Sequence, residues 1–258
     1  MSGGAAVASE CLAIWSSSID DAREFPLGLF LRFFQNHGLL NIVDRPQWYV
    51  IRNGSRSYIP ALTEPVQEIK LDCAVTAVRR RDQAVEIDSA EGSRSFDEVV
   101  LACHSDQAMR LLKDISEDEQ QVLGGLRYRE NEVVLHTDRN LLPKHRQAWA
   151  SWNFWQGQSS DSAPAVTYNM NILQGLDADE TFCVTLNRTA DIEPGKILRE
   201  FRYAHPVYDS NTVQSQQNRD LICGRNRTHF CGAYWYNGFH EDGVKSALDV
   251  CARFGASL

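Results

Sequence analysis

The sequence predicts an α/β fold (α+β mixed), in which an α/β body is interrupted by an antiparallel sheet. Residues 99–102 form a continuous apolar run, which is typical of a strand buried on both faces. Residues 126–186 contain short strand-like runs separated by Pro, Gly, Ser and Asp clusters, which is typical of an antiparallel sheet. Residues 227–255 then show a strand, a glycine-rich turn and a helix. Together these features favour one body with an inserted sheet.

The composition limits the possible partners. The chain has 258 residues, of which 43% are hydrophobic and 23% charged, so it can form one large domain or two smaller ones. Its formal net charge of −8 argues against a nucleic-acid partner, because phosphate contacts need clustered Lys and Arg. The basic run at residues 79–81 is expected to be a solvated strand end.

The location and the cysteine chemistry also follow from simple counts. No apolar stretch approaches the roughly 18 residues that a transmembrane helix needs. The N-terminus, MSGGAAVASE, lacks the basic start and apolar core of a signal peptide, so we expect a cytoplasmic protein. The cysteines are odd in number and never form a C-x-x-C pair, so we expect reduced thiols. They are Cys11, Cys73, Cys103, Cys183, Cys223, Cys231 and Cys251.

The first part of the chain predicts two helical segments. Residues 25–40 place apolar side chains on most faces of a helix, with Arg32 as the only charge, which favours a buried helix. A lining for an apolar ligand channel and a membrane-surface contact remain alternatives. Further along, an apolar run stops at the tight turn of Asn53 and Gly54, and a second helical segment begins near Ser55.

Residues 72–104 give the clearest β signal. Runs of β-branched residues at 75–78 and 85–87 precede a turn at Glu91 and Gly92, and the apolar run at 99–102 follows. The spacing after this run predicts a helix that begins with Ser105 as its N-cap and stops at Gly124 and Gly125.

The remaining elements complete the sheet and return the chain to the body. NEVVLHTD, AWASWNFW, AVTYNMNIL and TFCVTL are predicted strands, residues 194–208 a helix, and residues 229–233 a strand. A final helix from about Asp242 keeps Val244, Ala247, Leu248 and Cys251 on one face. The predicted regions are 1–70 (helical, substrate side), 71–120 (body), 121–222 (antiparallel sheet, substrate domain) and 223–258 (closing segment).

The closing segment has two interpretations from physics alone. Gly232 directly follows an apolar strand, so another backbone or a ligand can approach it closely. Gly238 and Gly243 flank the start of the final helix, whose first amide groups stay free for an anion or an electron-rich ring edge. A purely structural unit and a ligand site remain equal alternatives.

The closing sequence FCGAYWYNGFHEDGVKSAL resembles the C-terminal flavin-binding segment of the FAD-dependent amine oxidase superfamily. AVTAVRRRDQAVEI resembles the family's adenine-side strand, FDEVVLACHSDQAMRLL the element beside the cofactor, and RPQWYVIRNGSRSYIPAL the segment before the adenine strand. The similarity is to the bacterial NAD/FAD-binding, amine-oxidase-like branch and covers nearly the whole chain. It implies FAD as cofactor and a partial FAD-binding domain, residues 71–120 and 223–258, around the inserted sheet.

The resemblance implies cofactor contacts in three places. Val75 would contact the adenine side through its backbone, and Ala102 and Cys103 would end a strand next to the dinucleotide. Gly232 and Ala233 would face the ribityl chain, although many family members have Glu or Asp where this chain has Ala233. The last helix would aim its first amides at flavin O2 and N1, along Phe239, His240, Glu241, Asp242, Gly243 and Val244.

The sequence departs from the family at its beginning. The family opens with a Rossmann unit whose G-x-G-x-x-G turn binds the pyrophosphate. SGGAAV lacks that spacing, and no strand precedes it. We therefore expect the C-terminal part of a flavoprotein, truncated or split, with a partner chain as one source of the Rossmann domain.

Two other kinds of site fit the sequence less well. The run HED at residues 240–242 would point in three directions on a helix, and no His or Cys pair stands at ligand spacing, so we expect no metal. Cys103 with His104, or His104 with Ser105, would pair a nucleophile with a base, but neither pair lies in a known nucleophile elbow.

Aromatic residues mixed with amides predict the substrate side. WNFWQ and TYNMN suit an apolar pocket with a few orienting polar groups, while a role as core residues remains the alternative. On the family resemblance, the substrate would contact Trp152, Asn153, Tyr168, Asn169 and Trp235.

Two functions follow as hypotheses. The first is an FAD-dependent oxidoreductase in which an amine or an apolar, lipid-like small molecule loses hydride to the flavin, with O2 or another acceptor reoxidising the ring. The sequence assigns no catalytic acid or base to it. The second is a non-catalytic or partner-dependent subunit that binds no FAD alone, which the missing Rossmann motif favours.

Overall fold

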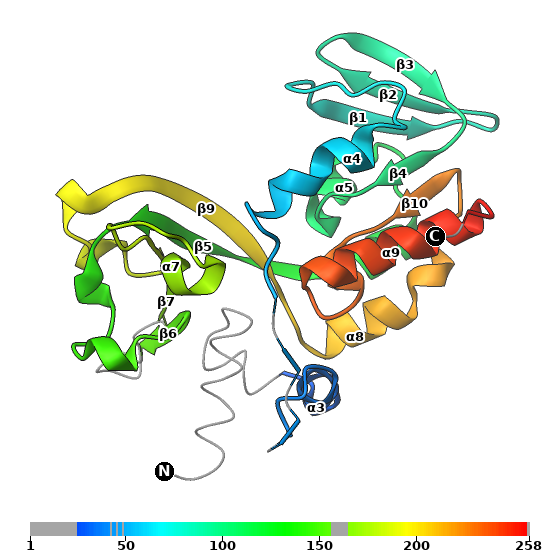
Figure 1. The fold of residues 1–258 in the computed structure, drawn as a ribbon. Helices are drawn as coiled ribbons and strands as arrows, with labels where there is room; N and C mark the ends of the chain where they lie inside the picture. Colours follow the sequence, from blue (N-terminus) through cyan, green and yellow to red (C-terminus); the bar gives the residue numbers. More distant parts are fainter. Residues whose placement is uncertain (1–24, 42, 45, 48, 156–164, 257–258) are drawn as a thin grey trace. The chain divides into compact units, whose positions relative to one another are not determined.

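The computed structural model describes residues 25–256 apart from 42, 45, 48 and 156–164 (Figure 1). The chain divides into two compact units, and each is described by itself. The sheet unit contains Phe34–Gln67 and Tyr128–His205, and the body unit contains Phe25–Phe33, Glu68–Arg127 and the chain from Pro206 onward. The body is therefore interrupted by a sheet, and the mixed fold predicted from the sequence is confirmed.

The sheet unit is built on five strands in the order β6-β7-β8-β5-β9. The pairs β6 with β7, β7 with β8, and β5 with β8 are antiparallel. The four strands predicted from residues 126–186 are all present. The strand bounds are β5 Arg127–His136, β6 Trp152–Trp155, β7 Ala165–Asn169, β8 Cys183–Leu186 and β9 Ile197–Val207, and the short helices are α4 (Ile59–Thr63) and α7 (Met170–Gln174).

The helix predicted at residues 194–208 is wrong, because this segment forms β9. Its aromatic residues explain the difference. Phe201 and Tyr203 stack with ring centroids 5.4 Å apart, and the Arg199 guanidinium lies 5.0 Å above the Phe201 ring. Residues two apart share a face only on a strand, so these contacts favour the extended backbone.

The body unit contains two small sheets and most of the helices. Strands β1 (Val75–Arg80), β2 (Val85–Ser89) and β3 (Gly92–Phe96) form an antiparallel sheet. Strands β4 (Val99–Leu101) and β10 (Thr228–Phe230), far apart in the sequence, pair in parallel. The helices are α5 (Ser105–Leu111), α6 (Glu117–Gly124), α8 (Ser210–Gln217) and α9 (His240–Arg253), and α3 (Leu27–Asn36) crosses the boundary between the units.

The single helix predicted after Ser105 is two helices. The N-cap of α5 is His104, one residue earlier than predicted, and α5 ends at Leu111. Ser116 starts α6 with a capping box, in which its hydroxyl accepts from the Glu119 amide and the Glu119 carboxylate accepts from the Ser116 amide. A capping box is a strong helix start, so it separates the two helices.

The same Glu119 forms a buried ion pair with β1. Arg80 Nη1 and Nη2 donate to the two Glu119 carboxylate oxygens at 2.8 and 2.9 Å. Both side chains are almost completely buried, with 4% and 1% of their surface exposed. A two-pronged contact of this kind fixes the orientation of both groups, so it joins β1 to α6.

Among the residues that the structure describes, no helix is long and apolar enough to cross a membrane. The cytoplasmic location stays a prediction. The six cysteines that the structure describes are all free thiols, and Cys11 lies outside the described residues.

We predict that Arg80→Met strongly destabilises the body unit. Removing the guanidinium leaves the Glu119 carboxylate buried without a counter-charge, which costs about 3–5 kcal/mol of unfolding free energy. Arg81→Met is the matched control, because Arg81 pairs with Glu86 at an exposed site and its loss costs at most about 1 kcal/mol. Urea unfolding measures both values, and similar losses for the two variants would contradict the prediction.

Candidate active site

The closing segment is positioned by the parallel pairing of β4 with β10. Phe230 lies opposite Leu101, and the Cys231 amide donates to the Leu101 carbonyl at 3.1 Å. The carboxyl ends of both strands therefore meet at one edge, where the chain continues into Ala102 after β4 and Gly232 after β10. Ligands of α/β sheets characteristically bind outside the carboxyl ends of parallel strands.

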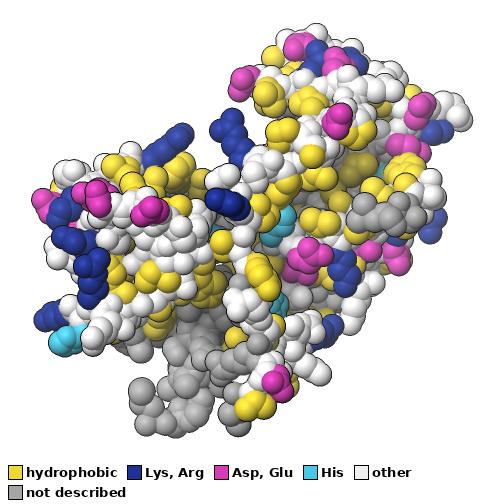
Figure 2. Space-filling view, viewed as in Figure 1, with side chains coloured by type: hydrophobic (Ala, Val, Ile, Leu, Met, Phe, Trp, Pro, Cys, Tyr) yellow, Lys and Arg dark blue, Asp and Glu magenta, His cyan; other side chains and the backbone are white. Residues whose placement is uncertain are grey.

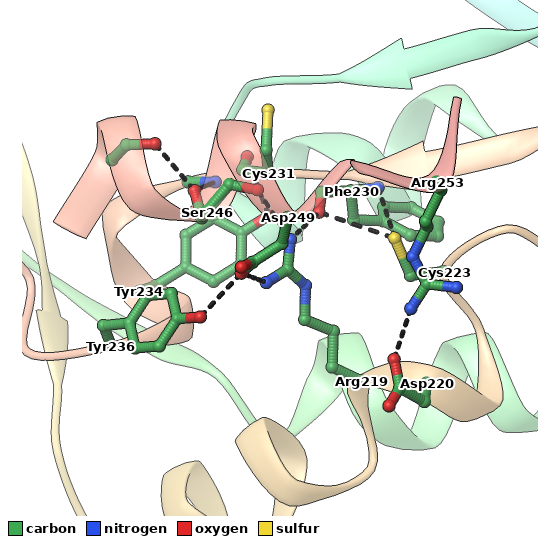
Figure 3. A network of polar contacts seen from close by, with 12 residues as sticks. Arg219, Asp220, Cys223, Phe230, Cys231, Tyr234, Tyr236, Ser246, Asp249 and Arg253 are labelled. Atoms are coloured by element: carbon green, nitrogen blue, oxygen red, sulfur yellow. Dashed lines mark hydrogen bonds and ion pairs between the residues drawn. The ribbon is translucent and has the colours of Figure 1, made fainter. Parts of the chain in front are cut away.

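The side chains of Gln216 and Arg219 hold the loop between β10 and α9. Gln216 Nε2 donates to the carbonyls of Tyr234 and Tyr236 at 2.8 and 2.7 Å. Arg219 Nη2 donates to the carbonyls of Phe230 and Ser246 at 3.0 and 2.8 Å (Figure 3). The loop is therefore tied to α8 on one side and to α9 on the other.

Ser246 on α9 joins the loop to the helix through its hydroxyl. Its hydroxyl accepts from the Gly232 amide and donates to the Gly243 carbonyl, each at 2.8 Å. Ser246 is completely buried. One hydroxyl thus ties Gly232, two residues after the end of β10, to the first turn of α9.

A second polar contact joins the loop to α9. The Asp249 carboxylate accepts from Arg219 Nη1 and from the Tyr236 hydroxyl, both at 2.6 Å (Figure 3). Burial, and then the hydrogen bond to Asp249, raise the pKa of Tyr236 to about 12. Tyr236 therefore stays protonated at neutral pH and acts here as a hydrogen-bond donor.

The glycines of this segment differ in what surrounds them. A Cβ atom on Gly232 would lie 2.3 Å from Tyr234 Cε1, so the space beside Gly232 is filled by a ring of the same loop. Gly238 has a φ of 90°, and a Cβ there would lie 2.5 Å from the Tyr208 hydroxyl oxygen. A Cβ on Gly243, in contrast, meets no atom within 4 Å, although Gly243 lies inside a helix.

Helix α9 begins two residues before the predicted start near Asp242. It starts at His240, and the Phe239 amide donates to the Asp242 carboxylate at 3.0 Å. The Glu241 side chain is exposed and also lies in the first turn. The amides of a first turn have no carbonyl one turn earlier in the helix, so they can donate to another group. Of the predicted contacts at this end, Val244 is exposed as well.

The predicted adenine-side residue lies elsewhere in the body unit. Val75 is the first residue of β1, and its side chain is exposed. Its register against β2 shifts between Val75 and Ala77, which is a local bulge. The predicted cofactor residues therefore fall into two groups, one at the start of β1 and one at the β4–β10 edge.

The thiols at this edge are not activated. Burial raises the pKa of Cys103, and burial also raises the pKa of Cys231. A thiol with a raised pKa carries little thiolate at neutral pH, so neither is suited to nucleophilic attack. Among the described residues, no group of three or more His, Cys, Asp or Glu side chains is placed to hold a metal ion.

The predicted substrate residues lie on opposite faces of the sheet. Trp152 and Tyr168 are directly paired on β6 and β7, and their rings meet edge to face at 5.7 Å. Phe154 shares this face. Trp152 is 38% exposed, and Phe154 and Tyr168 are partly exposed. Burial raises the pKa of Tyr168, so its hydroxyl keeps its proton. This aromatic face is the part of the sheet that suits an apolar ligand.

The side-chain amides of Asn153 and Asn169, which were predicted to contact the substrate, form hydrogen bonds within the sheet unit. Asn153 Nδ2 donates to the carbonyls of Ala150 and Thr167 at 2.7 and 3.1 Å, and Asn169 Oδ1 accepts from the Ile172 amide at 3.2 Å. Both side chains are buried. Their contacts to substrate stay predictions, as do those of Trp235, which is buried in the body unit.

The sequence analysis missed a buried polar row on the opposite face. His136 Nε2 lies 2.7 Å from the Thr185 hydroxyl, which lies 2.9 Å from the Thr167 hydroxyl. The Asp138 amide donates to His136 Nδ1 at 3.0 Å, so Nδ1 accepts and Nε2 carries the proton. Burial lowers the pKa of His136. Alternation along the strands could have shown that these residues share a face, but not that the face is buried.

A groove of about 530 Å³ lies elsewhere in the sheet unit. Its lining includes Glu132, Thr189, Glu200, Phe201 and Arg202. Charges of both signs line it, so it does not match the apolar pocket predicted from the sequence.

No family model and no curated protein matches the chain, whereas solved structures do. The CLA-producing fatty acid isomerase from P. acnes is 13% identical with a TM-score of 0.66, over 98% of this chain and 63% of that one. Cyclohexylamine oxidase from Brevibacterium oxydans is 11% identical with a TM-score of 0.61, over 97% and 64%. Putrescine oxidase with bound putrescine is 10% identical with a TM-score of 0.55, over 80% and 54%.

These likenesses establish the fold. The chain has the mixed fold with antiparallel sheets that these enzymes share, and it spans less than two thirds of the length of each. Two of the three are oxidases named after amines, and one is named after a fatty acid.

We predict opposite effects for alanine at the two glycines that Ser246 joins. Gly232→Ala forces the Tyr234 ring out of place, and overpacking of this kind lowers the unfolding free energy by about 1–3 kcal/mol. Gly243→Ala raises it by up to about 1 kcal/mol, because alanine is the better helix former and its methyl group meets no atom. Thermal unfolding monitored by circular dichroism compares the two, and a destabilised Gly243→Ala would contradict the open space seen here.

We predict that stability falls as the pH drops below about 6.5, the usual pKa of an unfolded histidine. The pKa of His136 is lowered by burial, so below this pH the unfolded chain binds a proton that the folded chain does not. The stability is fully present above pH 6.5 and is lost as the pH falls toward the lowered pKa.

Denaturant unfolding between about pH 7.5 and 5 measures this loss, and His136→Gln should reduce it. His145→Gln is the control, because His145 is exposed in the same unit. His229, whose pKa burial also lowers, leaves a residual pH dependence in both variants. The pKa of Asp138 is itself lowered, by amide donors and Lys196 against the effect of burial, so it acts at more acidic pH. An unchanged pH profile in His136→Gln would reject the assignment.

Proposed function

We propose that the chain is the C-terminal portion of an FAD-dependent oxidoreductase that takes hydride from an amine or from an apolar, lipid-like substrate. The observation that carries the proposal is the hydrogen-bonded edge where β4 and β10 end and α9 begins. A helix start next to the carboxyl ends of parallel strands is a recurrent place for a dinucleotide. The fold shared with oxidases of amines supports the same kind of reaction.

The residues at this edge fit a flavin at one glycine and not at the other. Gly243 leaves open space at the first turn of α9, where a glycine costs about 1 kcal/mol relative to alanine and no described atom requires it. The close approach of a ring would explain that glycine. Gly232 offers no such space, because Tyr234 fills it, and Ala233 brings no carboxylate for ribityl hydroxyls.

The cofactor and the protein would contribute different parts of the chemistry. FAD, when bound, supplies a ring that accepts hydride. The first amides of α9 would donate to an electron-rich edge of that ring, and the positive end of the helix dipole favours negative charge there. Ser246 and Arg219 would keep these amides in place, because they fix the loop and the helix to the strand end.

The aromatic face of the sheet suits the substrate. Trp152, Phe154 and Tyr168 offer an apolar surface with two polar groups, the Trp152 indole N–H and the Tyr168 hydroxyl. The pKa of Tyr168 decides what its hydroxyl can do. Because burial raises its pKa, that hydroxyl can donate one hydrogen bond to orient a substrate but is a poor base at neutral pH. No catalytic acid or base is assigned to a residue.

A second candidate function is a partner-dependent subunit that binds no FAD alone. It is favoured at the end of β10, where the Tyr234 ring fills the space beside Gly232 and Ala233 brings no carboxylate for a cofactor. The pyrophosphate contacts would then come from another polypeptide.

We predict that the flavin site depends on the open space at Gly243. FAD added to the purified chain should give bands near about 370 and 450 nm that persist through gel filtration. Gly243→Leu fills the space and should weaken FAD binding at least about tenfold, a loss of about 1.4 kcal/mol. Gly195→Leu is the control, because a Cβ there also meets no atom but lies in the sheet unit.

The outcomes separate the two functions. FAD binding that Gly243→Leu abolishes and Gly195→Leu preserves supports the oxidoreductase. Wild-type protein that takes up no FAD supports the partner-dependent subunit. FAD binding that neither variant changes would place the cofactor away from α9 and reject the site.

A further inference from the structure

Strand β9 forms one end of the five-stranded sheet, next to β5 (Figure 1). It runs for 11 residues, about twice the usual length of a strand, and its residues 197–205 belong to the sheet unit. In the part of the chain that the structure describes, no strand pairs with its second edge. An open edge presents backbone amides and carbonyls without strand partners, so another strand can bind there.

The side chains along this edge are accessible. Leu198 is 54% exposed and Tyr203 is 51% exposed. Figure 2 shows acidic, basic and hydrophobic side chains next to one another on the visible face of the sheet unit. Natural edge strands often prevent pairing with lysines or with a proline inside the strand. Residues 197–205 contain neither, and their charges are of both signs, so this edge lacks these two safeguards.

Two opposite charges of β9 lie on the same face of the sheet. Glu200 and Arg202 are two residues apart on a strand, so they share a face, and both line the groove of the sheet unit. Both side chains are exposed. Neither forms an ion pair with another residue in the part of the chain that the structure describes. Both charges are therefore available to a partner that approaches this edge.

Symmetry limits how a second copy of the chain can bind to the same edge. When two identical strands pair around a twofold axis, residue i lies opposite residue j and residue j opposite residue i. Directly opposite residues of an antiparallel pair lie on the same face of the sheet. One residue of each strand therefore lies at the axis, opposite itself. The register centred on Phe201 is the one that pairs all of residues 197–205 with one another.

The charges favour this register over its two neighbours. With Phe201 at the axis, Glu200 lies opposite Arg202 of the second copy, and the pair occurs twice. With Glu200 at the axis two carboxylates would face each other, and with Arg202 at the axis two guanidinium groups would do so. Opposite charges at facing positions stabilise a strand pair, whereas like charges destabilise it. The Phe201 register also places Arg199 opposite a Tyr203 ring, which attracts a cation.

We propose that β9 pairs with β9 of a second copy of the chain, antiparallel and in the register centred on Phe201. The two five-stranded sheets then form one continuous sheet across a twofold axis, with an ion pair between Glu200 and Arg202 on each side of the axis. This contact does not depend on the proposed function. A strand pair buries less area than a standard interface between proteins, so the dimer dissociates on dilution.

Analytical ultracentrifugation of the purified chain over about a hundredfold range of concentration tests the dimer. Wild-type chain should sediment as a monomer and a dimer in equilibrium. Arg202→Glu places a carboxylate opposite Glu200 on both sides of the axis, so it should raise the dissociation constant at least about tenfold. Lys144→Glu is the matched control, because it makes the same change of charge at an exposed site of the sheet unit and should change the constant less than about twofold.

A reciprocal exchange of the two charges tests the register itself. Glu200→Arg alone should weaken the dimer as Arg202→Glu does. Glu200→Arg combined with Arg202→Glu restores opposite charges at the facing positions, so the dissociation constant should return to within about threefold of the wild-type value.

Four outcomes would overturn the proposal. The first is a monomer at every concentration, and the second is self-association that Arg202→Glu leaves unchanged. The third is a loss of the dimer that the exchanged pair of charges does not restore. The fourth is growth beyond a dimer, because pairing around a twofold axis uses the open edge of β9 in both copies and is closed.

Discussion

The contacts of Arg219 determine the geometry of the whole closing segment. One guanidinium binds the end of β10 through the Phe230 carbonyl and binds α9 through Ser246 and Asp249, and it lies 5.2 Å from the Trp235 ring. A guanidinium has five donors in a rigid plane, so it can fix several groups at defined angles. Because β10 is in register with β4, the same contacts fix where α9 begins relative to both strands.

The two faces of the five-stranded sheet carry different kinds of side chain. The face with Trp152 and Tyr168 is aromatic and partly accessible, whereas the face with His136, Thr167 and Thr185 is polar and buried. A buried polar face is stable only when its groups are hydrogen-bonded, and the row of contacts across three strands meets that condition. Binding of an apolar ligand is therefore compatible with one face only.

The sequence predicted the elements with a strong local signal. The run at residues 99–102, the four strands of the inserted sheet and the closing helix were all found, because their apolar periodicity is set by local burial. Residues 194–208 were misread as a helix, because Lys196, Leu198 and Glu200 are good helix formers and the strand is held by β5 and by the stacked pair Phe201 and Tyr203.

The candidate site was predictable only in part. The composition of the closing segment indicated a strand, a turn and a helix start, and the structure brings these together with Ala102 and Cys103. The sequence could not show that the Tyr234 ring fills the space beside Gly232, because that contact depends on side-chain conformation. The roles of Arg219 and Ser246 also escaped prediction, since single polar residues without a motif carry no signal about their distant partners.

The parallel pair of β4 and β10 also has a consequence for how the chain folds during synthesis. The sheet unit from Tyr128 to His205 is continuous, so most of it can form as soon as it leaves the ribosome. The body unit needs β10 and α9 from the end of the chain. Strand β4 therefore keeps an unpaired edge until β10 has been synthesised, and an unpaired strand edge favours aggregation.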